Sequence, residues 1–342
     1  METDNIHRRI HYLDTLRVIA ITMIIAIHSP LPGLDNSGLT YSAVSFLMAA
    51  GIGLFFMVSG SLLLPCHNSM SVFLKRRLSK VVFPTLFWTL VYLFLNWIQH
   101  GTTFEQAIQS ILSIPFSTQG TGILWFMYTL IGLYLMVPIL SPWLEQASKR
   151  EIQFVLLLWG VSLCFPLLKI ILMVNESREG ILYYFSGYAG YFLLGYYLKK
   201  YHKSINMSVV FLLIFIPLSI ATIAKLMSIK VDFYSVFWYL SVFVVMMCAG
   251  WYLLVMKLFR NYHSQWIQLV SQCSFGIYLI HIFIMRQLVW KWDFISQFGC
   301  LPQIIMTVLL TFTISLAIVY LIGHFPFSRY IIGFEKKQQK TD

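Results

Sequence analysis

Long apolar stretches follow one another along almost the whole chain and are separated by short polar segments. A helix of about 20 apolar residues is long enough to cross a hydrocarbon core of about 30 Å. We therefore predict an all-α polytopic membrane protein with about ten transmembrane helices and no soluble domain between them. The predicted spans are residues 12–30, 42–65, 80–98, 123–142, 152–173, 182–198, 206–227, 235–256, 266–288 and 302–322.

Lysine and arginine are distributed unevenly over the segments that connect these spans. Ten spans put both termini on one side, and the segments of that side hold seventeen Lys and Arg residues. The opposite segments hold only Arg178, Lys230 and Lys291. Because cytoplasmic loops are enriched in Lys and Arg, both termini are predicted to be cytoplasmic. The loops 31–41 and 99–122, which contain neither residue, are predicted to be external.

Composition agrees with the membrane interpretation. Hydrophobic residues make up 58% of the chain and charged residues 11%, whereas soluble domains average about 25% charged residues. The net charge of +11 follows the membrane topology, so we expect a lipid bilayer and no nucleic acid as a partner. Five cysteines show no metal-ligand spacing, and we expect neither a disulfide nor a bound metal.

The first span carries two ionisable side chains within an apolar helix. Arg17 and His28 are eleven residues apart, which on an ideal helix puts them within roughly 20° of one face and about 16 Å apart along the axis. Such residues cost about 2.5 kcal/mol or more to insert, which makes them candidate functional residues. Asp14 lies three positions before Arg17, and we expect its carboxylate to hold the guanidinium. The alternative is an ion pair at the membrane interface.

His28 is the candidate general base. The imidazole has an unperturbed pKa near 6.5, so it accepts a proton at neutral pH. No serine or cysteine nucleophile motif accompanies it, which favours direct activation of a hydroxyl acceptor. The alternative is a histidine that is hydrogen-bonded to a loop carbonyl.

Four cations lie at the start of the third span: Lys75, Arg76, Arg77 and Lys80. Anchoring of the helix at the cytoplasmic surface would explain them. Arg77 and Lys80 also share a helix face, and arginine binds phosphate oxygens in a bidentate manner while lysine supplies a point charge. With Arg17, this cluster is a candidate site for a polyphosphate that approaches from the cytoplasm.

Polar and aromatic side chains in three other spans are candidate substrate contacts. In each case a structural explanation stands beside the functional one: close helix packing in the second span, an aromatic belt at the start of the fourth, and interhelical hydrogen bonds in the ninth. The candidates are Ser59, Trp125, Tyr128, Ser274, Tyr278 and His281.

Together these residues resemble the integral membrane acyltransferase 3 family. The resemblance rests on five motifs in order: LDTLR at 13–17, FFMVSG at 55–60, RLSKVVFP at 77–84, LWFMY at 124–128 and FGIYLIH at 275–281. Within the family the chain is similar to short bacterial O-acetyltransferases, such as the one that acts on enterobacterial common antigen. Lys80 departs from the family pattern, where arginine is commoner, and it lacks bidentate geometry.

The resemblance implies one membrane domain over residues 1–342, with 323–342 as a short cytoplasmic tail, in a bacterial inner membrane. It also implies transfer of an acetyl or other small acyl group from cytoplasmic acetyl-CoA to a hydroxyl of a glycan or lipid-linked sugar. His28 would be the base, or alternatively a transient carrier of the acyl group, with Asp14 and Arg17 as its supporting pair. The donor phosphates would be bound by Arg17, Arg76, Arg77 and Lys80.

A glycan exporter or transporter is the rival hypothesis. Ion-coupled transporters usually need acidic residues in mid-membrane. Asp14 is the only carboxylate within any predicted span, which counts against ion coupling.

Overall fold

The computed structural model describes residues 9–31, 38–116, 122–173, 179–202, 206–227, 229 and 236–336. These residues form helices and contain no strand, which confirms the all-α membrane fold. The main helices of the bundle are α1 (His11–His28), α2 (Leu39–Met48), α3 (Ala50–Leu63), α4 (Met70–His100), α6 (Trp125–Gln146), α7 (Lys149–Ser162), α8 (Phe165–Leu172), α9 (Ala189–Tyr201), α10 (Met207–Leu226), α12 (Val242–Leu258), α13 (Gln265–Gln287) and α15 (Cys300–Ile322). Short helices are α5 (Phe104–Ser113), α14 (Asp293–Ser296), α16 (Ser328–Ile332), η1 (Gly122–Leu124), η2 (Tyr183–Phe185) and η3 (Val289–Lys291).

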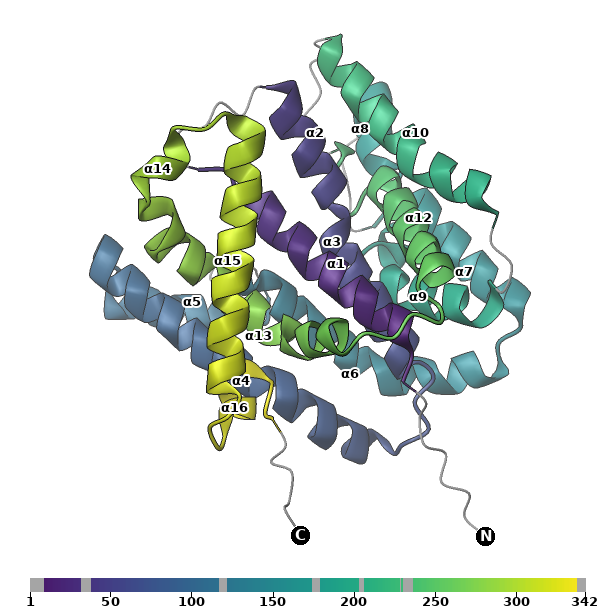
Figure 1. The fold of residues 1–342 in the computed structure, drawn as a ribbon. Helices are drawn as coiled ribbons and strands as arrows, with labels where there is room; N and C mark the ends of the chain where they lie inside the picture. Colours follow the sequence, from purple (N-terminus) through teal and green to yellow (C-terminus); the bar gives the residue numbers. More distant parts are fainter. Residues whose placement is uncertain are drawn as a thin grey trace.

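Each predicted span overlaps one helix or two consecutive helices. In the described part of the chain, eight helical stretches are long and apolar enough to cross a membrane. The sixth and eighth predicted spans correspond to α9 and α12, which have 13 and 17 residues, fewer than the about 20 that a straight crossing needs. The number of ten crossings therefore stays a prediction. Figure 1 shows that α1 begins, and the described chain ends after α16, on the same side of the molecule.

The helices differ in burial, and α1 lies near the centre of the bundle (Figure 1). The stretches containing α1, α2 with α3, and α13 are 56%, 78% and 67% buried. Those containing α4, α6, α7, α10 and α15 are 22% to 33% buried. The outer helices thus turn most of their apolar side chains outward, as lipid-facing helices do. His28 and Arg17 therefore lie on a helix that is enclosed by protein.

Close backbone contact between α3 and α9 explains the small residues of the second span. A Cβ atom at Gly60 would overlap the backbone of Phe192, and one at Gly195 would overlap the backbone of Met57. Small residues at such positions let membrane helices approach closely and gain van der Waals contact. The helix-packing explanation of this motif is confirmed for Gly60.

The helix α4 is longer than the third predicted span, because it begins at Met70 and not at residue 80. Its 31 residues correspond to about 46 Å, so its basic first turns extend beyond the hydrocarbon core. Gly101, in the left-handed region with φ of 63°, ends it. Pro84 lies inside this helix. In the loop that follows, Thr103 and Gln106 form a capping box that starts α5.

Candidate active site

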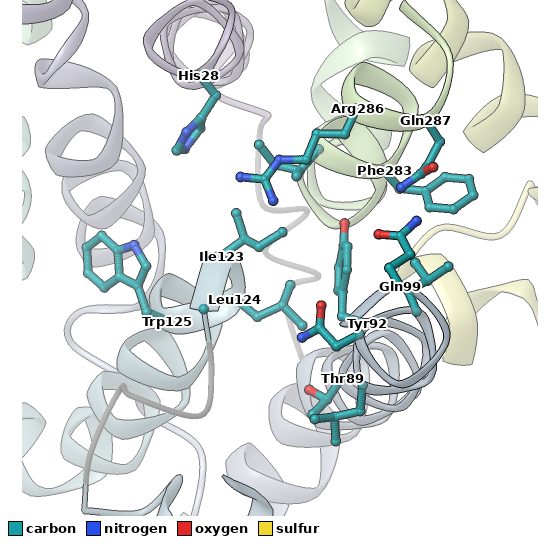
Figure 2. Close-up of a pocket in the computed structure, with 15 residues that line it drawn as sticks. His28, Thr89, Tyr92, Gln99, Ile123, Leu124, Trp125, Phe283, Arg286 and Gln287 are labelled. Atoms are coloured by element: carbon teal, nitrogen blue, oxygen red, sulfur yellow. The ribbon is translucent and has the colours of Figure 1, made fainter. Parts of the chain in front are cut away.

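A cavity of about 470 Å³ lies at the end of α1 that carries His28. Its walls come from the second half of α4, from η1 and the start of α6, and from the last turns of α13 (Figure 2). The polar and aromatic lining includes His28, Tyr92, Gln99, Trp125, Arg286 and Gln287. By the predicted topology this is the external end of the bundle, so we call it the outer cavity.

A second imidazole lies beside His28. The ring centroids of His28 and His281 are 5.7 Å apart. Nδ1 of His281 lies 2.6 Å from the carbonyl oxygen of Tyr278, and a carbonyl only accepts, so Nδ1 bears the hydrogen. Nε2 is buried and has no hydrogen-bond partner among the described residues. In the neutral ring it is therefore an unused acceptor, adjacent to the candidate base.

The other two candidate residues of α13, Ser274 and Tyr278, form structural hydrogen bonds. Tyr278 donates its hydroxyl hydrogen to the carbonyl of Ile123, at 2.8 Å, and so joins α13 to η1 in the wall of the outer cavity. Ser274 donates to the carbonyl of Ser271, one turn back in the same helix, at 2.7 Å. Hydrogen bonding thus accounts for both side chains, and their contact with substrate stays a prediction.

Trp125 and Tyr128 both contact protein, which the aromatic-belt explanation does not require. Trp125 lines the outer cavity. The centroid of its ring is 5.5 Å from the ring centroid of Tyr188 and 5.4 Å from that of Tyr239. The Tyr128 hydroxyl lies 2.5 Å from Oγ1 of Thr89, another residue of the cavity wall. The structure therefore brings Trp125 to the cavity that His28 lines and fixes Tyr128 behind it.

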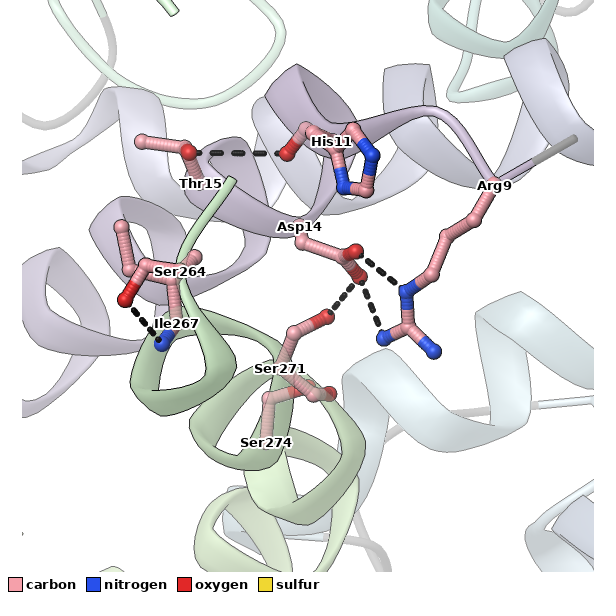
Figure 3. A network of polar contacts seen from close by, with 8 residues as sticks. All are labelled: Arg9, His11, Asp14, Thr15, Ser264, Ile267, Ser271 and Ser274. Atoms are coloured by element: carbon pink, nitrogen blue, oxygen red, sulfur yellow. Dashed lines mark hydrogen bonds and ion pairs between the residues drawn. The ribbon is translucent and has the colours of Figure 1, made fainter. Parts of the chain in front are cut away.

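The prediction that the Asp14 carboxylate holds the Arg17 guanidinium is wrong, because Asp14 binds other residues directly. Arg9 donates two hydrogen bonds to the Asp14 carboxylate, at 2.7 and 3.1 Å, and Ser271 donates a third at 2.6 Å (Figure 3). Ile10 is extended, and Arg9 precedes the helix and turns back onto its first turn. Asp14 thus ties the chain before α1 to α13, while it reaches Arg17 only through the electrostatic field.

Arg17 is half-buried on the inner half of α1. It lies within electrostatic range of Tyr134 of α6 and Arg77 of α4. The Tyr134 hydroxyl also lies close to the side chain of Ser59. The structure thus brings two predicted site residues, Arg17 and Ser59, to one tyrosine. No sequence pattern pointed to Tyr134, which lies in an ordinary apolar run.

A second cavity, of about 410 Å³, lies at the opposite end of α4. The structure brings all four basic residues of the predicted cluster to it and adds Arg329, which follows α15. The remaining lining residues are Ser79 and Tyr330, so no carboxylate lines it in the described chain. We call this the inner cavity. Arg329 is paired with Glu335 at 3.8 Å, and the other four cations make this a strongly positive concave surface, suited to an anion with several charges.

Sequence reasoning missed several residues of these cavities. Arg329 is 249 positions from Lys80, and no local pattern connects the two. Arg286 is recognisable in the sequence as a candidate functional residue, because it is an arginine inside the predicted span 266–288. It lies close to the predicted external end of that span, where Lys and Arg are otherwise scarce. Gln99 and Gln287 are ordinary helix-end residues until the fold brings them together.

Comparison with known proteins assigns the family. No curated protein and no solved structure gave a significant match. A family model described as an acyltransferase domain matches residues 10–324, nearly the whole chain. That stretch holds the first helix and every residue of the outer cavity. The chain is thus a membrane acyltransferase and belongs to the acyltransferase 3 family.

Proposed function

We propose that this protein transfers an acetyl or other small acyl group from cytoplasmic acyl-CoA to a hydroxyl of a glycan or lipid-linked sugar, in a bacterial inner membrane. One observation carries the proposal. A cavity with five cations and a cavity lined by His28 lie at opposite ends of α4. An acyl-CoA has a polyanionic end and a reactive thioester at its other end, and the two cavities match these two ends.

The inner cavity supports binding of the donor phosphates. Arginine forms bidentate, charge-assisted hydrogen bonds with phosphate oxygens, and Arg76 and Arg77 are available for them, with Lys80 as a point charge. Arg77 also interacts with Arg17, so positive charge continues from α4 to α1. From Arg17 to His28 the helix rises about 16 Å, which is about the reach of an extended pantetheine arm.

In the proposed reaction His28 accepts the proton of the acceptor hydroxyl while the hydroxyl oxygen attacks the thioester carbonyl. The C–O bond forms and the C–S bond breaks. The thiolate of coenzyme A leaves and takes up the proton that His28 received, which restores the neutral imidazole. The products are an O-acyl sugar and free coenzyme A, and no metal or redox cofactor is needed.

The direct test uses purified protein in nanodiscs, isotope-labelled acetyl-CoA and total cell-envelope glycans, with mass spectrometry of the products. We expect a labelled O-acetyl ester in a glycan fraction with the parent protein and none with His28→Ala. A labelled ester that forms equally with both proteins would contradict the role of His28. If no ester forms while glycan crosses proteoliposomes, the exporter hypothesis replaces this one.

A further inference from the structure

Arg286 introduces one positive charge into the outer cavity. It lies on the last turn of α13, and its side chain extends into the cavity with the guanidinium on the side toward His28 (Figure 2). It interacts electrostatically with His28 and with Tyr92 of α4. The candidate base, His28, therefore lies within the electrostatic field of Arg286.

This guanidinium has little to bind within the protein. Its recorded neighbour in the described chain is the ring of Trp290, with the guanidinium carbon 5.8 Å from the ring centroid. None of the residues that line the outer cavity, in the described parts of the chain, is acidic. Arg286 is exposed at the end of α13, where an arginine side chain reaches the interface and stays solvated, so its five N–H donors are open to a ligand.

The residues around Arg286 suit a sugar. Asn96, Gln99 and Gln287 bring three carboxamides to the same cavity, each with two donors and an acceptor for hydroxyl groups. The ring of Trp125 forms part of the wall and offers a flat amphipathic face. Small-molecule sites commonly combine a mainly apolar wall with a few such polar groups.

We propose that Arg286 binds an anionic group of the acyl acceptor, either a sugar carboxylate or a phosphate, so that the acceptor is an acidic or phosphate-linked saccharide. The inference rests on the proposed function, because it takes the outer cavity as the acceptor site. Pairing with Arg286 would anchor the acceptor by its charge and leave a hydroxyl free to approach His28. Selection among glycans then depends on a residue that takes no part in the proton transfer.

The experiment measures equilibrium binding in neutral detergent, so it does not depend on turnover. Three probes are compared by thermophoresis: decyl glucuronide for a sugar carboxylate, decyl phosphate for a phosphate, and decyl glucoside as the neutral analogue. The proteins are the parent, Arg286→Gln, Arg286→Lys and Lys291→Gln. Lys291 is the matched control, because it is an exposed cation on η3, directly after α13, and does not line the cavity.

We expect the parent to bind at least one anionic probe roughly ten- to a hundredfold more tightly than decyl glucoside, which is the size of a charge-assisted contact. Arg286→Gln should lose this preference without weakening decyl glucoside binding, Arg286→Lys should keep part of it, and Lys291→Gln all of it. Which anionic probe is preferred distinguishes a sugar carboxylate from a carrier phosphate.

Two results would overturn the inference. One is a parent protein that binds neither anionic probe more tightly than decyl glucoside, or an Arg286→Gln variant that retains the preference. The other is complete displacement of the anionic probes by equimolar phosphatidylglycerol, which would make Arg286 a lipid anchor. Either result leaves the acyltransferase proposal intact, because the labelled acetyl-CoA assay tests that proposal separately.

Discussion

The inner and outer cavities have similar volumes, about 410 and 470 Å³, but different chemistry. The inner cavity is lined by five cations and the outer cavity by one, together with His28, three carboxamides and Trp125. Lys75 and Gln99, at the two extremes of these walls, are 24 positions apart on α4, or about 36 Å. The cavities therefore lie at opposite ends of α4. The number of positive charges, and not the size, distinguishes the end that suits a polyphosphate from the end that suits an acceptor.

His28→Ala is expected to show the largest difference between the two cavities, because it should abolish acetyl transfer and leave acyl-CoA binding intact. Removal of a general base typically lowers the rate 10²- to 10⁴-fold, about 3 to 5 kcal/mol in activation free energy. Acyl-CoA binding should stay near the parent value, because the phosphates would be held at the other end of the bundle. Acetyl transfer and acyl-CoA affinity are the two measurements. His67→Ala is the control, since His67 is an exposed imidazole in the segment between α3 and α4. A variant that transfers acetyl within threefold of the parent rate would refute the base assignment.

The double variant Arg77→Ala/Lys80→Ala is expected to show the opposite pattern. Each charge-assisted phosphate contact is worth about 1.5 to 3 kcal/mol. The apparent KM for acyl-CoA should therefore rise roughly tenfold to a hundredfold. The KM for the acceptor should not change. Lys149→Ala serves as the control, because Lys149 is an exposed cation at the start of α7 that does not line the cavity. Unchanged acyl-CoA dependence in a well-inserted double variant would reduce the cluster to a membrane anchor.

Asp14→Asn tests whether Asp14 belongs to the inner cavity or only to the helix frame. Because its direct partners are Arg9 and Ser271, we expect a loss of stability of about 1.5 kcal/mol, seen as a lower Tm in detergent. The KM for acyl-CoA should stay close to that of the parent. Ser271→Ala, which removes one of the same hydrogen bonds, should lower Tm by a smaller amount. A tenfold rise in KM without a change in Tm would mean that Asp14 acts through Arg17 after all.

Tyr134→Phe should have the smallest effect. It removes the hydroxyl that lies close to Ser59, and a neutral hydrogen bond is worth about 0.5 to 1.5 kcal/mol. If the path between the cavities runs along this face of α1, the KM for acyl-CoA should rise roughly twofold to tenfold. Tyr262→Phe is the matched control, because Tyr262 is an exposed tyrosine after α12. Equal kinetics in the two variants would exclude Tyr134 from the donor path.

The parts of the fold that depend on local pattern were predictable. Apolar stretches of sufficient length predict helices wherever they occur, and the ends of α4 and α5 follow from Gly101 and Thr103. The Arg17 and His28 face of α1 follows from helical periodicity alone. The predicted basic cluster likewise lies together, because its members share one helix.

Contacts between distant segments were not predictable from such patterns. The partner of Asp14 was expected among its helix neighbours, but the chain before α1 turns back and Ser271 approaches from α13. Arg329 and Tyr134 reach the site only through the packing of α15, α16 and α6. Ser274 matched the polar stripe yet bonds within its own helix. A single sequence does not show which of two polar residues on one face meets a neighbour.

Pro84 lies on α4 between the residues that line the inner cavity and those that line the outer one. A proline has no N–H, so the carbonyl of Lys80 loses its usual helix hydrogen bond and the helix is mechanically weaker at that point. Beyond it, the indole of Trp88 donates to the carbonyl of Ile331, at 3.0 Å, and braces the outer half against α16. Because α16 also carries Arg329 and Tyr330 of the inner cavity, this hydrogen bond links the walls of the two cavities across the weak point at Pro84.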